Sequence, residues 1–156
     1  MFSESLQIRE VNSEDCALLF TWVNEDGVRV NSIQSNFITW ENHVRWFSEK
    51  LLSVNTKIFI LEQGGVAVGQ VRFDKDDKDY WVIDYSIDPN FRSKGFGGLI
   101  LSYGIKQFPL NTTKFVGYVK NTNKASIKVF EKLNFKKEKV KISGGAFYKF
   151  TCNERH

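Results

Sequence analysis

A short glycine-containing segment, Arg92 to Gly97 (RSKGFG), constrains the fold of this 156-residue chain more than any other feature. It follows a strand-like run that ends at Ile87 to Pro89, and the apolar residues Leu99, Ile100 and Tyr103 come after it at helical spacing. Glycines in such a loop let the backbone approach a ligand closely, and a helix N-terminus offers unpaired N–H groups to an anion. The segment therefore predicts a strand–loop–helix unit suited to a pyrophosphate, although glycines at this place are also ordinary turn material.

The spacing of apolar residues predicts the elements around this unit, in the order β-α-α-β-β-β-α-β-α-β-β. Strands are expected at 6–11, 57–61, 66–73, 80–87, 114–119, 137–142 and 146–151, and helices from Ser13, after Thr39, at 95–108 and at 123–133. This order indicates an α/β or α+β domain with a mixed, mostly antiparallel central sheet flanked by helices. No linker or repeat interrupts the chain, so residues 1–156 are expected to form a single domain.

Composition excludes several classes of protein. No window approaches the roughly 20 apolar residues of a membrane span, so a cytoplasmic protein without a membrane partner is expected. Cys16 and Cys152 match neither a metal-ligand spacing nor a disulfide framework, and we expect both to be reduced and no metal to be bound. The net charge of +4 is modest and no nucleic-acid motif accompanies it. The lysines at 132, 136, 137, 139 and 141 form either a solvated face or a field that attracts phosphate-bearing ligands.

In its context, the pattern Arg92-x-x-Gly95-x-Gly97 resembles the acetyl-CoA-binding motif of the GCN5-related N-acetyltransferase (GNAT) superfamily. A P-loop is excluded because no Gly-Lys-Ser/Thr follows the glycines. A dinucleotide-binding fingerprint is excluded because the pattern comes late in the chain and has no βαβ unit around it. A second segment, Asn123 to Phe135, resembles the later helix of that family, which flanks the pantetheine arm of the cofactor. Nearly the whole chain fits the element order of the family. The resemblance therefore implies the GNAT fold and an acetyl-CoA-dependent N-acetyltransferase.

The resemblance also assigns cofactor contacts to individual residues. The main chain of Ile87 would pair with the pantetheine, the amides from Arg92 to Gly98 would hold the pyrophosphate, and Asn123 and Ser126 would contact the arm. The full set is Ile87, Asp88, Arg92, Ser93, Lys94, Gly95, Phe96, Gly97, Gly98, Asn123, Ser126, Phe130 and Lys132. Lys132 would reach a CoA phosphate, but it equally fits a surface lysine.

Acetyl transfer also needs a group that takes up the proton of the amine and a donor for the departing thiolate. Many family members use a tyrosine of the later helix as the donor, and the matching position here is Phe130. Tyr118 is the candidate we name, with Tyr85, Tyr103 and Tyr148 as others, although buried tyrosines are usually core residues. The thiolate can also leave to water.

For the base, His43 is a candidate, because imidazole titrates near neutral pH, although it equally fits a structural histidine. The other histidine, His156, is the last residue and is expected to be disordered. Asp84 and Arg72 come from adjacent predicted strands and either orient the substrate or form a structural ion pair. No His or Asp neighbour activates either cysteine, which favours direct attack in a ternary complex over an acetyl-cysteine intermediate.

For the acceptor, the stretches 22–32, 38–47 and 69–74 resemble one subgroup. These are the sugar-nucleotide N-acetyltransferases of pseudaminic-acid and related surface-glycan pathways, which acetylate the 4-amino group of a UDP-linked deoxysugar. The resemblance implies that the substrate is bound by Arg29, Asn31, Trp40, Trp46, Arg72 and Tyr85. Aromatic rings would stack on the substrate and an arginine would meet the diphosphate, but Trp40 and Phe47 equally fit a helical core face.

Other functions remain open at this point. Within the enzyme class they are a ribosomal-protein or peptide N-terminal acetyltransferase, an aminoglycoside acetyltransferase and, least favoured for a basic chain, a polyamine acetyltransferase. Because Phe130 replaces the family tyrosine, a non-catalytic acyl-CoA-binding sensor is a further alternative. Phe147 and Phe150 of the final predicted hairpin are candidates for a contact across a homodimer.

Overall fold

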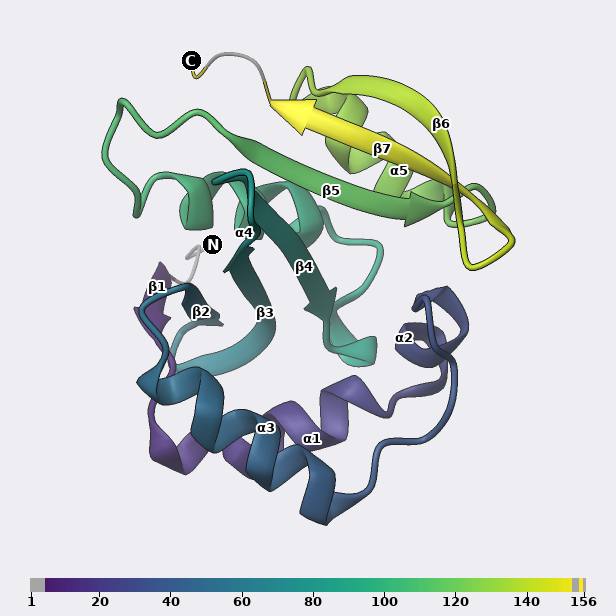
Figure 1. Cartoon of the computed structure of the whole chain (residues 1–156). Coiled ribbons are helices and arrows are strands. Elements are labelled where there is room, and N and C mark those ends of the chain that lie inside the picture. Colours follow the sequence, from purple (N-terminus) through teal and green to yellow (C-terminus); the bar gives the residue numbers. More distant parts are fainter. Residues whose placement is uncertain (1–4, 153–154, 156) are drawn as a thin grey trace.

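The computed structural model describes residues 5–152 and 155, so the expectation for His156 lies outside the described residues. The described part forms a seven-stranded sheet with strand order β1-β2-β3-β4-β5-β7-β6 (Figure 1). The strands are β1 (Leu6–Glu10), β2 (Thr56–Gln63), β3 (Val66–Lys75), β4 (Trp81–Ile87), β5 (Phe115–Lys120), β6 (Lys136–Ile142) and β7 (Gly145–Cys152). Neighbouring strands run antiparallel except β4 and β5, which run parallel. The expected fold class, a mixed and mostly antiparallel sheet flanked by helices, is confirmed.

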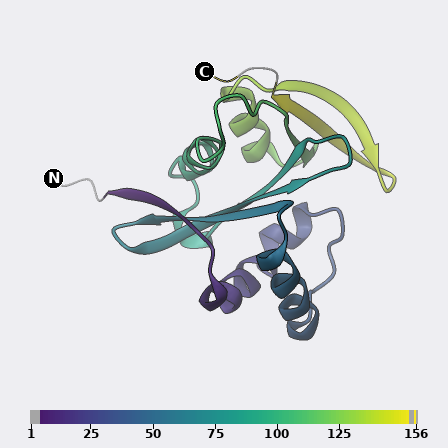
Figure 2. The same cartoon turned by 60° about the vertical axis from the view of Figure 1, so that its left-hand side comes forward.

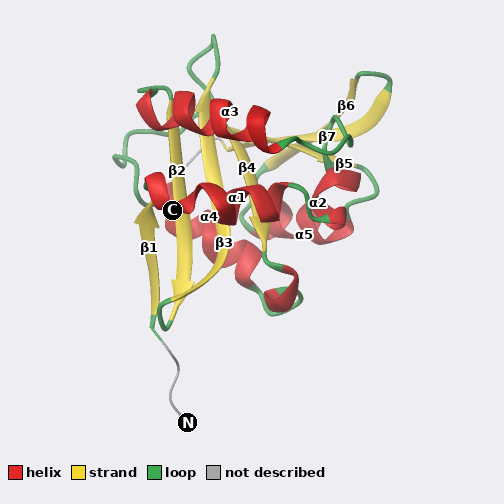
Figure 3. Cartoon of the chain, turned by 90° about the horizontal axis from the view of Figure 1, so that it is seen from below, coloured by secondary structure: helices red, strands yellow, loops and turns green. Residues whose placement is uncertain are grey.

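Helices cover both faces of the sheet (Figures 2 and 3). They are α1 (Cys16–Val23), α2 (Asp26–Asn31), α3 (Trp40–Leu52), α4 (Phe96–Ile105) and α5 (Lys124–Lys132), with short 3-10 turns at Ser13–Asp15 and Pro89–Phe91. Strand alternation divides the core: Ile58 and Ile60 pack with α1 and α3, whereas Phe59 and Leu61 pack on the face of α4 and α5. Each helical layer therefore has its own apolar cluster.

The predicted element order omits one helix. α3 begins after Thr39 as expected, and the Thr39 hydroxyl accepts a hydrogen bond from the amide of Asn42 at 3.3 Å. α2 was not predicted, because it has only six residues, includes Gly27 and buries no side chain in the core. A helix of that kind leaves no apolar period in the sequence.

The final hairpin turns at Ser143 and Gly144, and its aromatic residues face inward. Phe147 is 5% exposed and Phe150 is fully buried. These two residues are therefore part of the chain's own interior, and the predicted homodimer would need a different surface. Among the described residues, none of the helices combines the length and the apolar character needed to cross a membrane.

Candidate active site

The site begins where the parallel strands β4 and β5 separate. They pair only from Trp81 to Ile83 on β4, opposite Phe115 to Gly117 on β5. The Trp81 amide donates to the carbonyl of Lys114, so the main-chain groups of Trp81 point toward β5. The main-chain groups of every second residue in a strand point to the same side. Those of Tyr85 and Ile87 therefore point into the gap between β4 and β5. The separated strands thus leave an open edge with which an extended ligand could pair.

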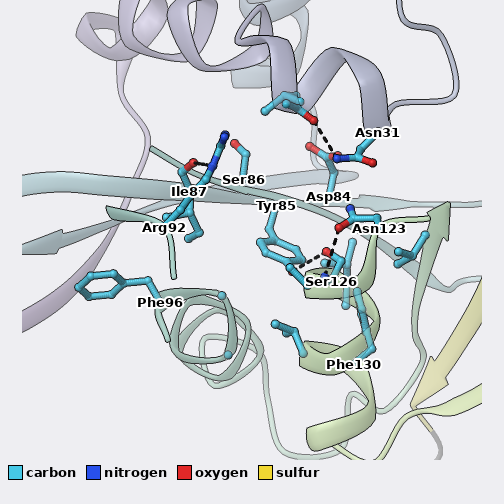
Figure 4. A pocket seen from close by; sticks show the side chains of 18 of the residues that line it. Asn31, Asp84, Tyr85, Ser86, Ile87, Arg92, Phe96, Asn123, Ser126 and Phe130 are labelled. Atoms are coloured by element: carbon cyan, nitrogen blue, oxygen red, sulfur yellow. Dashed lines mark hydrogen bonds between the residues drawn. The ribbon is translucent and has the colours of Figure 1, made fainter. Parts of the chain in front are cut away.

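A cavity of about 450 Å³ fills this gap, and we call it the glycine-loop cavity. Its walls come from α2, β4, the loop after β4, the start of α4, β5 and α5 (Figure 4). Ten of the thirteen expected cofactor residues line it: Ile87, Arg92, Ser93, Gly95, Phe96, Gly97, Gly98, Asn123, Ser126 and Phe130. The structure therefore brings two segments that lie far apart in the sequence to one cavity.

The other three expected cofactor residues do not line it. Asp88 instead accepts hydrogen bonds from the Trp22 indole N–H at 2.9 Å and from the Asn90 amide at 2.9 Å. The Lys94 ammonium lies 5.7 Å from the centre of the Phe91 ring. Lys132 is an exposed residue of the last turn of α5.

The glycine loop has the backbone geometry of an anion site. Ser93 and Gly95 both have positive φ, 63° and 84°. Gly95 is the N-cap residue of α4, and no side chain caps the first amides of this helix. The first amides of α4 are therefore left for a ligand, and alternating backbone conformations of this kind form concave N–H nests. The loop fits a phosphate group at the mouth of the cavity.

The opposite wall is polar near α5. The Asn123 side chain accepts from the Ser126 amide at 3.3 Å, and the Ser126 hydroxyl lies 2.5 Å from the Tyr85 hydroxyl (Figure 4). Burial raises the pKa of Tyr85 to about 12, partly offset by the hydrogen bond with Ser126. Tyr85 therefore keeps its proton at neutral pH.

Phe130 packs at the base of this wall. It is 2% exposed and stacks on Phe150, with ring centroids 5.0 Å apart. The tip of its ring lies against Gly117, where an added Cβ would be only 2.5 Å from the ring's Cζ. Phe130 of α5 is therefore closely packed on the face of β5 and β7 as well as lining the cavity.

A second cavity of about 660 Å³ lies on the other side of β4, and we call it the α1–α3 cavity. Of the residues expected to bind substrate or act in catalysis, Arg29, Asn31, His43, Trp46, Arg72, Asp84 and Tyr118 line it. Trp40 does not, and its ring packs against that of Phe20 at 5.1 Å. Tyr85 lines the glycine-loop cavity instead.

The two cavities meet at a small set of shared residues: Val28, Asn31, Ser32, Ile83, Asp84, Ser86 and Tyr118. Figure 4 draws Asn31 and Asp84 among the residues that line the glycine-loop cavity. Two ligands that fill the two cavities would therefore meet beside Asp84 and Tyr118.

Asp84 is held from the neighbouring strand β3. The Gln70 amide donates to Asp84 Oδ2 at 3.3 Å and to the Ser86 hydroxyl at 3.2 Å, and Arg72 Nη1 lies 3.6 Å from the same Oδ2. The Asp84 side chain is 56% exposed, so its other oxygen can face the cavity. Gln70 and Ser86 were not named from the sequence. Their alternation with Arg72 and Asp84 on two predicted strands was the available signal.

Arg72 is a shared partner of two carboxylates. Its Nε donates to Asp74 Oδ2 at 2.7 Å, and its guanidinium lies 5.0 Å from the Trp46 ring centre. Burial would lower the pKa of Arg72, but Asp84 and Asp74 outweigh it and raise the pKa. Arg72 is therefore permanently charged and holds Asp84 and Trp46 in place.

His43 is 2% exposed and lies among aromatic rings, stacked on Trp46 and Phe47. Its Nε2 is 2.8 Å from the Cys16 carbonyl, which can only accept, so Nε2 carries the hydrogen. Burial lowers the pKa of His43 by more than this hydrogen bond raises it. The imidazole is therefore neutral at pH 7, with Nδ1 as the nitrogen that can accept a proton.

Arg29 fixes the loop that follows α2. Its guanidinium donates to the carbonyls of Val23, Gln34 and Asn36 at 2.6, 3.0 and 3.2 Å. A further donation reaches the Ser32 hydroxyl at 3.2 Å. Arg29 thus shapes the rim of the α1–α3 cavity through main-chain contacts.

Neither cysteine lines either cavity. Burial raises the pKa of the Cys16 thiol, which disfavours the thiolate. Among the described residues there is no group of three or more His, Cys, Asp or Glu side chains that could hold a metal ion.

The arrangement joins a cavity whose loop suits an extended, phosphate-bearing ligand to a second cavity that could hold a reaction partner. The chain belongs to the acetyltransferase (GNAT) domain family, whose model matches residues 5–136. The expectation of an acetyl-CoA-dependent N-acetyltransferase is confirmed at this level. No curated protein matches the sequence.

Solved structures show the same fold at low sequence identity. A domain from Methanocaldococcus jannaschii superposes with a TM-score of 0.79 at 24% identity, covering 95% of this chain and 99% of the other. Spermidine N-acetyltransferase from Vibrio cholerae, in complex with CoA and spermine, gives 0.80 at 14% identity and 96% coverage of both chains. A ribosomal L7/L12 alpha-N-protein acetyltransferase in complex with coenzyme A gives 0.80 at 15% identity, covering 94% and 93%. At these identities the likeness extends to the fold alone.

Proposed function

We propose that this protein transfers an acetyl group from acetyl-CoA, held in the glycine-loop cavity, to a primary amine held in the α1–α3 cavity. The observation that carries the proposal is the junction of the two cavities at Asp84, Ser86 and Tyr118. A donor and an acceptor that each fill one cavity are brought together there, which is the main requirement of direct group transfer.

The glycine-loop cavity fits acetyl-CoA in shape and chemistry. The main-chain groups of Tyr85 and the amide of Ile87 suit the amides of a pantetheine arm, whereas the Ile87 carbonyl accepts from Arg92 Nε. The uncapped start of α4 at Gly95 suits a pyrophosphate. Asn123 and Ser126 would lie beside the arm. Acetyl-CoA would supply a thioester whose carbonyl carbon is open to attack by an amine.

At the junction, the Asp84 carboxylate can accept the proton that the amine must lose. Gln70 and Arg72 hold one of its oxygens, which leaves the other free to do so. The Tyr118 hydroxyl is the donor we assign to the departing thiolate, because Tyr118 lines both cavities while Tyr85 is engaged with Ser126. His43, through Nδ1, is the second candidate base. Direct attack remains the proposed route, because the pKa of the Cys16 thiol is raised and neither cysteine lines a cavity.

For the acceptor, we propose the 4-amino group of a UDP-linked amino-deoxysugar. The three stretches that resemble the sugar-nucleotide subgroup supply Trp22, Trp46, Gln70 and Arg72 to the walls of the α1–α3 cavity. A ring can stack on an indole there, and the polar groups around Asp84 can meet sugar hydroxyls. Because Arg29 and Arg72 already bind protein groups, we assign recognition of the sugar to Trp46 and the polar groups, rather than to a diphosphate clamp.

The test is transfer from labelled acetyl-CoA to a panel that contains a UDP-4-amino-sugar, N-terminal peptides, an aminoglycoside and spermidine. We expect product with the UDP-4-amino-sugar and none with spermidine. Acetylation of the peptide alone would replace the sugar proposal with an N-terminal acetyltransferase. Binding of CoA without transfer to any amine would replace it with the acyl-CoA sensor. Asp84→Asn is the matched inactive control.

A further inference from the structure

The placement of α2 depends on polar contacts at its two ends. None of its residues is buried, so it lacks the apolar anchor that holds α1, α3, α4 and α5. At its start, Glu25 is the N-cap and forms an ion pair with Arg92, with Arg92 Nη2 and Glu25 Oε2 2.5 Å apart. At its end, the Lys120 ammonium donates to the Val30 carbonyl at 2.6 Å.

These two contacts come from opposite sides of the gap in the sheet. Arg92 follows β4 and begins the glycine loop, whereas Lys120 is the last residue of β5. Glu25 and Lys120 therefore hold α2 across the opening between the separated strands, and Figure 1 shows α2 beside this opening.

The Arg92 guanidinium points toward α2. Its Nε donates to the Ile87 carbonyl at 3.1 Å, and its Nη2 donates to Glu25 (Figure 4 shows the bond to Ile87). Its Nη1 lies beneath the first turn of α2, because a Cβ added at Gly27 would be 2.9 Å from it. The hydrogen bond from Arg92 is also the main reason why the pKa of Glu25 is lowered, so the Glu25 carboxylate is ionised at neutral pH.

α2 supplies walls to both cavities. Val28, Asn31 and Ser32 line the glycine-loop cavity and also the α1–α3 cavity. Movement of α2 would therefore change the shape of the acceptor site next to Asp84. The residue that fixes one end of α2 belongs to the loop expected to bind the cofactor.

We propose that Glu25 and the Arg92 side chain are positioning residues that brace α2, so that Arg92 serves the cofactor through its main chain and the acceptor cavity through its guanidinium. The assignment of the cavities to donor and acceptor rests on the proposed function. The ion pair between Glu25 and Arg92, which holds the start of α2, does not depend on that assignment. We call this contact the brace. Glu25 touches neither reactant and acts through α2.

The test is hydrogen–deuterium exchange of the full chain, followed in peptides that cover residues 24–33, with CoA binding measured in parallel by calorimetry. The ion pair is partly exposed, with side-chain exposures of 39% for Arg92 and 24% for Glu25. A pair of this kind shifts a local opening equilibrium by about 1.4-fold to fivefold. We expect exchange at residues 26–32 to rise by about that factor in Glu25→Gln and in Arg92→Gln, and by no more in the double variant. Glu14→Gln, an exposed glutamate outside both cavities, is the matched control and should leave exchange unchanged.

CoA affinity separates the two roles of Arg92. The brace predicts that Glu25→Gln and Arg92→Gln change CoA affinity by no more than about threefold, because the main-chain amides remain. Unchanged exchange at 26–32 in both variants would overturn the proposal. So would a loss of CoA affinity beyond about tenfold in Arg92→Gln alone, since the guanidinium would then serve the phosphates. Failure of the wild-type chain to bind CoA would refute the proposed function instead, while the exchange result would still decide on the brace.

Discussion

Gly117→Ala tests the packing at the point where β4 and β5 separate. Gly117 is the last residue of β5 paired with β4, opposite Ile83. A Cβ at this position would lie 2.5 Å from Cζ and 2.8 Å from Cε1 of Phe130. Both distances are far inside van der Waals contact, so the ring must move. It cannot move easily, because it stacks on Phe150 at 5.0 Å and meets Phe135 edge-on at 5.2 Å.

The expected cost follows from this overlap. Adding a methyl group to a closely packed core destabilises by about 1–3 kcal/mol. For a chain of this length each kcal/mol lowers Tm by about 2–4 °C, so a fall of roughly 2–12 °C is expected. Thermal unfolding followed by circular dichroism measures it. Because Phe130 also lines the glycine-loop cavity, the displaced ring should weaken CoA binding as well.

Two further variants make this result decisive. Gly117→Ala combined with Phe130→Leu removes the atoms at the tip of the ring and should lose less stability than the two single changes added together. Gly98→Ala is the stability control, because a Cβ there meets nothing within 4 Å and the site is helical. The reasoning would be refuted if Gly117→Ala unfolded at the wild-type temperature, or if the double variant were strictly additive.

Three other changes probe the site. Asp84→Asn should lower kcat/KM for the acceptor by about 10²- to 10⁴-fold with CoA affinity unchanged in calorimetry, and activity close to wild type would exclude Asp84 as the base. Burial lowers the His43 pKa below its usual 6.5, so the unfolded chain binds a proton at a higher pH than the folded chain does. Wild-type stability therefore falls as the pH drops from about 7 to 5. His43→Gln should flatten this pH dependence of Tm. If the rate and its pH profile are also unchanged in His43→Gln, His43 is not the base. Arg29→Met should speed exchange in residues 32–38, where the guanidinium holds two carbonyls, by about tenfold or more, and slow exchange there would contradict its role in fixing this loop.

Much of the fold could be predicted from local patterns in the sequence. The strands of the meander and the helices α3, α4 and α5 were predicted because each shows its own apolar period or capping residue, as Thr39 does for α3. α2 could not be predicted in this way. Its contacts with Arg92 and Lys120 join residues 67 and 90 positions apart, and no local pattern records them.

In the candidate site, too, some parts could be predicted from the sequence and others depend on the tertiary structure. The strand–loop–helix unit at the glycine loop and the helix after Asn123 were predicted from the sequence, because each is a contiguous stretch with its own glycines or caps. Their role in binding a cofactor stays a prediction. The junction of the cavities could only come from the tertiary structure. It depends on the separation of β4 and β5 after Ile83 and on the register that places Gln70 opposite Ser86. The direction of the Arg92 guanidinium was decided in the same way, since an ion pair forms with whichever charge the fold brings near. The sequence by itself determined the conformation of the loop at which we propose that a phosphate-bearing donor binds, because main-chain geometry is local. The packing of strands and helices decided which side chains meet it, because those contacts join distant parts of the chain.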